Sequence, residues 1–141
     1  MDTKMYGIFE RSIDSKGRII LPNKLVKPNT EIVFLKDSEL EFKIYLLKQL
    51  EQIIEKYKNI YHQTFEVEKR KQIDETIESI ILNIVDTYEL DEQNRAVIPK
   101  LLRKEYELSD NVILNGLYDH FKVFPSEIKY KEYIKRSTIK F

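Results

Sequence analysis

Apolar residues recur along this chain in two different rhythms, which predicts a protein that mixes strands with helices. Short runs rich in Ile, Val, Phe and Tyr between turn residues are typical of strands. In the first half, such runs lie at about 7–13, 18–21, 31–35 and 41–45. Two other stretches place apolar residues at helical spacing. These residues are Leu46, Leu47, Leu50, Ile53 and Ile54 in the first stretch and Ile73, Ile77, Ile80, Ile81 and Ile84 in the second.

The second of these stretches, about residues 66–84, predicts an amphipathic helix between two halves of the chain. Its isoleucine stripe is expected to pack on the strands. A subunit interface is the alternative, because a small domain has a limited inner face against which to bury several such helices.

An internal repeat organises the sequence at an offset of 77 residues. Residues 13–25 read Ile-Asp-Ser-Lys-Gly-Arg-Ile-Ile-Leu-Pro-Asn-Lys-Leu, and residues 90–102 read Leu-Asp-Glu-Gln-Asn-Arg-Ala-Val-Ile-Pro-Lys-Leu-Leu. The similarity continues downstream, so two copies of one structural unit are expected. We predict a single two-repeat domain over 1–141, with a first repeat at 6–50, a helical connector at 51–84 and a second repeat at 85–134.

The tight turn of each repeat carries a residue suited to positive φ. Gly17 stands between the first two strands, and Asn94 takes the same place in the second repeat. Asn is the usual non-glycine residue in that conformation. We therefore expect positive φ at both positions and tolerance of glycine at 94. After the last predicted strand, Ser126 is placed to cap a C-terminal helix.

Composition narrows the function classes. The chain has 24 basic and 24 acidic side chains, two histidines and no cysteine. Disulfides, thiolate metal sites and cysteine nucleophiles are excluded, and a multi-histidine metal site is disfavoured. No apolar run approaches the roughly 20 residues of a membrane helix, and the N-terminus does not resemble a secretory signal. We expect a cytoplasmic protein without a cofactor or metal.

Charge is uneven along the chain although its sum is zero. Residues 11–27 hold five basic side chains against Asp14 alone. A near-neutral protein lacks the simplest indication of nucleic-acid binding, and a short basic stretch is more often a solvated face than a binding site.

The pattern Asp-x-x-x-Arg occurs once in each repeat, as Asp14 with Arg18 and as Asp91 with Arg95. The carboxylate can accept hydrogen bonds from turn N–H groups, and the guanidinium fork suits guanine edges or phosphates. A salt bridge between the two, within or between repeats, is the plainer interpretation of these residue types. Duplication favours DNA, since two equivalent arginines suit a ligand with twofold symmetry.

The repeated Asp-x-x-x-Arg-x-x-x-Pro pattern resembles the AbrB/SpoVT type of swapped-hairpin DNA-binding domain. Two copies in a chain of this length, with helices between and after them, resemble the MraZ family. The stretch 7–22, Gly-Ile-Phe-Glu-Arg-Ser-Ile-Asp-Ser-Lys-Gly-Arg-Ile-Ile-Leu-Pro, is similar to that family's opening motif. The resemblance spans about residues 6–134.

This resemblance implies an α+β fold in which two repeats interlock as a swapped-hairpin β-barrel with helices outside. It also implies a closed, ring-shaped homo-oligomer. The corresponding function is that of a bacterial, nucleoid-associated transcriptional regulator on tandem repeats of double-stranded promoter DNA, upstream of the division and cell-wall gene cluster.

The family's DNA-contacting arginines fall on Arg18 and Arg95, and Lys16 matches a basic residue of the first motif. The predicted DNA-binding set is Lys16, Arg18, Arg95, Arg11 and Gln93, and the predicted turn-structuring set is Asp14, Gly17, Asp91 and Asn94.

The second motif departs from the family pattern. Its turn residue is Asn94, a basic position is absent, and Glu89, Asp91 and Glu92 make it acidic. We expect the second repeat to contribute less to DNA affinity.

Two rival functions stand beside DNA binding. One is an oligomeric interaction or scaffold protein that keeps the fold without specific DNA binding, which the neutral net charge favours. The other is an enzyme with carboxylates in a ring cleft. Since no phosphate loop or catalytic spacing is present in the sequence, we predict a non-enzyme with no catalytic residues.

Overall fold

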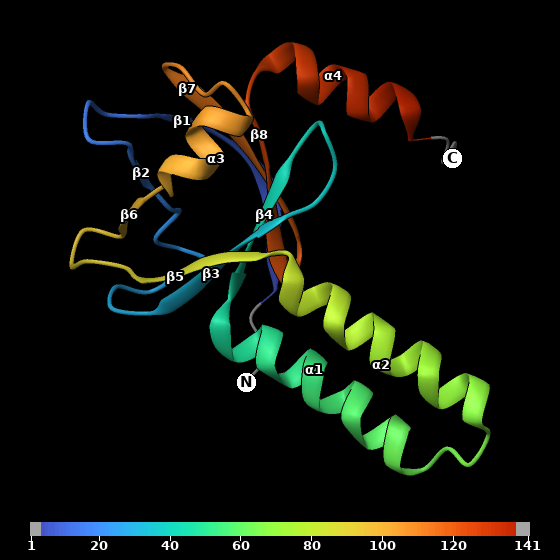
Figure 1. Cartoon of the computed structure of the whole chain (residues 1–141). Coiled ribbons are helices and arrows are strands. Elements are labelled where there is room, and N and C mark those ends of the chain that lie inside the picture. The colour runs from blue at the N-terminus through green and yellow to red at the C-terminus, as the bar shows by residue number, and fades with distance from the viewer. Residues whose placement is uncertain (1–3, 138–141) are drawn as a thin grey trace.

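The protein is described by a computed structural model over residues 4–137, which form eight strands and four helices (Figure 1). The strands are β1 (Met5–Ser12), β2 (Arg18–Ile20), β3 (Glu31–Lys36), β4 (Phe42–Leu46), β5 (Ile84–Glu89), β6 (Arg95–Val97), β7 (Asn111–Tyr118) and β8 (His120–Phe124). The helices are α1 (Leu47–His62), α2 (Val67–Leu82), α3 (Lys100–Glu105) and α4 (Glu127–Arg136). The predicted α+β class is confirmed.

Six of the strands form one antiparallel sheet in the order β1-β7-β8-β4-β3-β5, and β2 and β6 form a separate two-stranded ribbon. The ribbon packs its inner side chains into the same core as the large sheet. Strands β1 and β5 are the two edges of that sheet, so within the described residues hydrogen bonds do not close it into a complete barrel. The predicted barrel is thus an open sheet with a ribbon across it.

Strand pairing interlocks the two repeats. The first strand of each repeat pairs with the third strand of the other, β1 with β7 and β5 with β3. Equivalent strands also pair with each other: β4 with β8, centred on Lys43 opposite Lys122, and β2 with β6, centred on Ile19 opposite Ala96. A pseudo-twofold axis therefore relates the repeats and passes through both of these pairs, which is the topology of swapped hairpins.

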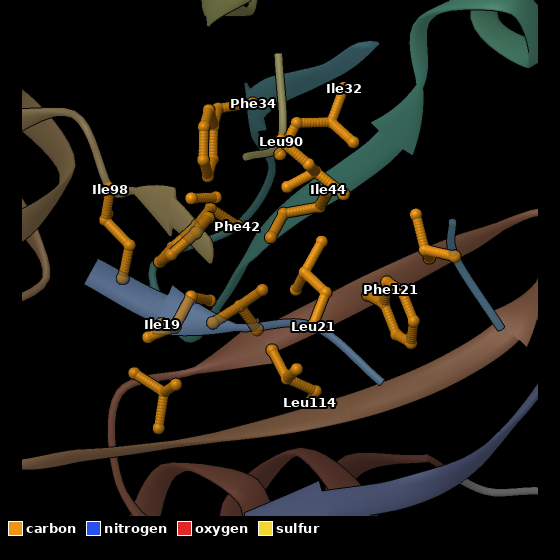
Figure 2. Close-up of a cluster of buried hydrophobic side chains, with 14 of the residues drawn as sticks. Ile19, Leu21, Ile32, Phe34, Phe42, Ile44, Leu90, Ile98, Leu114 and Phe121 are labelled. Atoms are coloured by element: carbon orange, nitrogen blue, oxygen red, sulfur yellow. The ribbon is translucent and has the colours of Figure 1, made fainter. Parts of the chain in front are cut away.

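The main core lies between the large sheet and the ribbon (Figure 2). Alternate residues of each strand point inward, as the twofold periodicity of a strand requires. Phe34, Phe42 and Phe121 come from the sheet, and Ile19 and Ile98 come from the ribbon and its exit. All five are buried almost completely.

Helices α1 and α2 form a hairpin that projects away from the sheet (Figure 1). A second, smaller cluster holds its base: Val33, Leu35 and Leu50 are buried, and Ile80 and Ile84 pack against them. Packing of the isoleucine stripe on the strands is thus confirmed at these two positions. Ile81, by contrast, is 50% exposed.

Two short features refine the expected elements. The hydroxyl of Ser126 accepts a hydrogen bond from the Lys129 N–H at 3.2 Å, so the predicted N-cap of α4 is confirmed. Helix α3 was absent from the sequence-based elements. It begins after Pro99, and the equivalent Pro22 begins only a single turn, in which the Val26 N–H donates to the Pro22 carbonyl. Six residues are too few to display a helical period.

Candidate nucleic-acid interface

Both Asp-x-x-x-Arg turns are built in the same way from their aspartates. One carboxylate oxygen of Asp14 accepts from the N–H groups of Lys16 and Arg18, at 2.9 Å each. Asp91 accepts in the same manner from Gln93 and Arg95, at 2.9 Å each. Each aspartate therefore ties together the turn that presents its arginine.

The second carboxylate oxygen pairs with the arginine side chain of the same turn. Arg18 Nε lies 2.7 Å from Asp14 Oδ2, and Arg95 Nε lies 2.6 Å from Asp91 Oδ2. Of the two pairings that the sequence leaves open, the one within a repeat is present. The two arginine side chains remain 27% and 31% exposed, and no partner for their terminal nitrogens occurs among the described residues. The aspartate orients the guanidinium and leaves its outer edge available.

The same hydrogen bonds set the charge state of the turns. The pKa of Asp14 is lowered chiefly by the Arg18 backbone N–H, and the Arg18 side chain and the Lys16 N–H lower it further. The pKa of Asp91 is lowered chiefly by the Arg95 backbone N–H, with the Arg95 side chain and the Gln93 N–H adding to it. Both carboxylates are therefore ionised near neutral pH, where each neutralises part of its arginine's charge.

Gly17 and Asn94 have φ of 80° and 59°, the conformation expected from the alignment of the turns. Each turn also docks on the other repeat. The Gly17 carbonyl accepts from the Ile98 N–H and the Asn94 carbonyl accepts from the Leu21 N–H, at 2.9 Å each. The turns are thus held from both sides of the pseudo-twofold axis.

The register of the ribbon places both arginines on one face. Arg18 lies opposite Val97, and Arg95 lies opposite Ile20. Cross-strand partners and residues two apart share a face, so these four side chains point the same way. The intervening Ile19 and Ala96 are buried on the other face. The outward face therefore carries two guanidiniums related by the pseudo-twofold axis.

The remaining predicted binding residues divide into two groups. Lys16 and Gln93 occupy equivalent exposed positions at the tips of the two turns. Arg11 instead makes hydrogen bonds within the protein. Its Nε donates to the Ile20 carbonyl at 2.8 Å, and its Nη1 donates to the Glu10 carbonyl at 3.1 Å. Its guanidinium therefore links strand β1 to the end of β2.

Arg103 is a further basic residue at this surface that motif analysis did not single out. A Cβ added at Gly17 would lie 2.5 Å from Arg103 Nη1, so this side chain packs directly over the first turn. Arg103 Nε donates to the Ile98 carbonyl at 3.0 Å. Comparison of the repeats could not indicate this residue, because the 77-residue offset aligns Arg103 with the apolar Val26.

The two turns consequently differ in charge. Lys16 and Arg103 lie at the first turn with Arg18, whereas the second turn carries Glu92 where the first has Ser15. The ribbon face is symmetric in backbone but more positive on the side of the first repeat.

Comparison with known proteins finds proteins that are similar in sequence to this chain. A family model described as "MraZ protein, putative antitoxin-like" matches residues 82–141. A protein of Caldanaerobacter subterraneus subsp. tengcongensis is 27% identical over 97% of this chain and 91% of its own. It is named transcriptional regulator MraZ. This chain is thus similar to MraZ proteins over most of its length.

Two other similar proteins carry the same name. A transcriptional regulator MraZ of Thermoanaerobacter sp. is 26% identical over 97% of this chain and 91% of its own. Its counterpart in Mycoplasmoides gallisepticum is 24% identical over 84% of this chain and 79% of its own. These names belong to regulators and not to enzymes, in agreement with the non-enzymatic character expected from the sequence. The family model matches the second repeat, so the departures in that repeat's turn are changes within an MraZ-like unit.

Two further features are absent from residues 4–137. None of the helices there combines the length and the apolar character needed to cross a membrane. In the same range, no cluster of three or more His, Asp or Glu side chains is arranged to hold a metal ion.

Proposed function

We propose that this protein is a bacterial transcriptional regulator that binds double-stranded DNA sequence-specifically through the outward face of the β2–β6 ribbon. The observation that carries the proposal is the pair of partly exposed guanidiniums, Arg18 and Arg95, on one face of a ribbon with pseudo-twofold symmetry.

The shape and chemistry of the ribbon support this proposal. The major groove of B-DNA admits a two-stranded β-ribbon, and arginine pairs bidentately with guanine O6 and N7. Here the Nε of each arginine is held by an aspartate, so a fixed guanidinium edge points outward. The twofold relation between the arginines matches the local dyad of a duplex. Lys16 and Arg103 add positive charge beside the first turn for phosphate contacts.

The relatives support the regulatory part of the proposal, since they are named transcriptional regulators. We place this protein in the cytoplasm, associated with the nucleoid, as a closed homo-oligomeric ring on tandem promoter repeats upstream of the division and cell-wall genes. One protomer has a net charge of zero, so several protomers on neighbouring sites are needed for firm binding. Linked sites can raise avidity roughly 10²–10⁴-fold without new contacts.

A mobility shift against the DNA upstream of the protein's own gene tests the proposal. Arg18→Ala should weaken binding by about 1–3 kcal/mol per lost base contact. Arg95→Ala should weaken it less, because Glu92 already reduces the local potential. Arg136→Ala is the matched control, since this exposed arginine lies on α4, outside the ribbon, and should leave binding unchanged. Equal binding by wild type and Arg18→Ala would sink the proposal.

A scaffold protein that keeps the fold without specific DNA binding is the second candidate. The zero net charge and the acidic residues Glu89 and Glu92 favour it. Retention on heparin that falls steeply with salt supports DNA binding, because phosphate contacts release counterions. Passage through heparin at low salt, with an unchanged oligomer mass, supports the scaffold.

A further inference from the structure

The pseudo-twofold axis relates a covered outer face on one half of the sheet to an uncovered one on the other. On the first half, strands β3 and β5 carry Val33, Leu35 and Ile84 on their outer face, within the small cluster that α1 and α2 cover. On the second half, the matching pair of strands is β7 with β1. The outer faces of the two strand pairs can therefore be compared position by position.

The matching positions on the second half remain open. Val33, fully buried, corresponds to Ile113, which is only partly buried. Ile84 lies opposite Leu35 in β3, and Ile8 lies opposite the corresponding residue in β7. Ile84 packs in the cluster, whereas Ile8 is 61% exposed. Ile8 and Ile113 keep the apolar character of these strand positions, whereas Asn115 replaces Leu35. The second half lacks the cover that α1 and α2 give the first.

The helices repeat this contrast. Helix α4 follows β8 as α1 follows β4, and an offset of 80 residues aligns Leu50 with Tyr130 and Ile54 with Ile134. Leu50 is buried and Ile54 packs on the cluster. Tyr130 lines an open groove of about 290 Å³, with Ile8, Glu10, Ile113 and Glu127 among its neighbours there. Ile134 is half exposed.

One element accounts for the difference. On the first half, α2 supplies Ile80 to the cluster before the chain enters β5. None of the helices within residues 4–137 takes the place at β1 that α2 takes at β5, so no equivalent of α2 covers the groove there. The groove between β1, β7 and α4 therefore has the position and lining of a site for a helix.

We propose that this groove receives the end of the α1–α2 hairpin of a second copy of the chain. The hairpin end is defined by Ile60, Phe65 and Val67 and is unusually apolar for a surface, with Phe65 91% exposed. The inference rests on the homo-oligomer of the proposed function and identifies the surfaces that build it.

Geometry and charge favour a second copy over the same copy. The hairpin of the same chain is held at its base by Ile80, and its end lies at the opposite end of the molecule from α4 (Figure 1). Residues 56–71, which form the hairpin end, carry five basic and two acidic side chains. The groove lining holds Glu10 and Glu127 against Lys131. A net positive helical end thus meets a net negative groove.

The contact is head-to-tail, because a different surface of each copy takes part. A heterologous contact of this kind generates a ring when its rotation closes. Every copy then uses its hairpin on one neighbour and its groove on the other.

Mixing two interface variants tests the inference by mass in solution, without DNA. Phe65→Glu damages only the hairpin end, and Ile8→Lys damages only the groove. Each variant alone should be monomeric by light scattering, at a concentration where the wild type is oligomeric. An equimolar mixture should double in mass, because the intact groove of one variant accepts the intact hairpin of the other. Leu101→Glu, at an exposed apolar residue of α3 outside both surfaces, is the matched control and should keep the wild-type mass.

Cross-linking provides a second readout, since the natural chain has no cysteine. Ile8→Cys mixed with Phe65→Cys should give a covalent dimer with a short bis-maleimide, and each variant alone should not. Replacing the partner by Leu101→Cys should abolish the product. Wild-type mass for both charge variants, or cross-linking of Phe65→Cys alone, would overturn the head-to-tail contact.

These outcomes separate the inference from the proposed function. An oligomer that survives both charge variants and still shifts DNA overturns the interface and leaves DNA binding intact. A monomeric wild type overturns both the interface and the oligomeric part of the function. Loss of DNA binding in Arg18→Ala with unchanged mass concerns the ribbon alone.

Discussion

Asn94 combines a backbone conformation with a buried side-chain contact. Its φ of 59° lies in the left-handed region, and its side-chain nitrogen donates to the Val26 carbonyl at 2.6 Å. The residue is 1% exposed, and its Oδ1 has no partner among the described residues. The contact ties the second turn to the first repeat, a role that the equivalent Gly17 cannot have.

Glycine at this position should therefore be harmful, contrary to the expectation from sequence. Asn94→Gly keeps the conformation but leaves the Val26 carbonyl without its donor, at a cost of about 1–3 kcal/mol for a buried group. Asn94→Val should cost more, because a β-branched residue is strained at positive φ. Urea denaturation measures both. Asn29→Gly is the matched control, since Asn29 has a similar φ of 63° but is exposed, and it should be nearly neutral.

The two turn aspartates make stability depend on pH. Their pKa values in the fold are lowered from an ordinary 3.8, so the folded protein binds these protons less tightly than the unfolded chain. Their contribution to stability is present above the ordinary pKa and is lost as pH falls through the folded one. The unfolding free energies of wild type and Asp14→Asn/Asp91→Asn should differ at about pH 6 and converge as the pH falls below 3.8. A constant difference across that range would contradict this account.

At the scale of elements, a buried ion pair joins the start of β4 to β8. Glu41 is 1% exposed, and its carboxylate lies 3.0 Å from Lys122 Nζ. Ser38 also donates to Glu41, and the Tyr106 hydroxyl donates to the Glu41 carbonyl at 3.0 Å. The pair with Glu41 and a contact with Asp37 at 3.2 Å raise the pKa of Lys122 despite its burial.

Removing one partner of this pair should destabilise the sheet. Glu41→Gln leaves the largely buried Lys122 ammonium with Asp37 as its remaining carboxylate partner, and breaking such a pair typically costs about 3–5 kcal/mol. Replacing both, as Glu41→Gln/Lys122→Met, should recover part of the loss. Glu39→Gln, which removes an exposed partner of Arg136, should change the unfolding free energy little. Thermal and chemical unfolding of the three variants measure these changes. Equal stability of Glu41→Gln and Glu39→Gln would contradict this account.

Elements were predictable where a local signal exists. The strands, both long helices, the Ser126 cap and the positive φ of Gly17 and Asn94 all follow from spacing or from the duplication. The short helix α3 was not predictable because six residues cannot display a helical period. The ion pair of Glu41 with Lys122 was not predictable because its partners lie far apart in sequence. The same is true of Arg103 over Gly17, which follows only from the interlocking of the repeats. The sequence therefore identified the two turns of the candidate site. The ribbon that places both arginines on one face could be recognised only from the fold.

At the scale of the whole molecule, DNA affinity should depend on the number and spacing of sites. A probe with tandem sites about 10–10.5 bp apart places them on the same side of the duplex, where neighbouring protomers reach them together. It should bind far better than a single site, by roughly 10²–10⁴-fold. Shifting the spacing by half a turn should remove most of that gain in a mobility shift. Equal affinity for single and tandem probes, by a monomer at micromolar concentration, would contradict the oligomeric binding mode.

The exchange of strands between the repeats also determines when the chain can fold during synthesis. Strand β1 begins at Met5, and its partner in the sheet ends at Tyr118. The first repeat alone would leave both β1 and β3 without the neighbours that the other repeat supplies. Distant pairings of this kind delay folding, because a long loop must close before the contacts form. On the ribosome, a chain that ends before β7 should thus remain sensitive to protease, and the molecule should become resistant only when its last third has emerged.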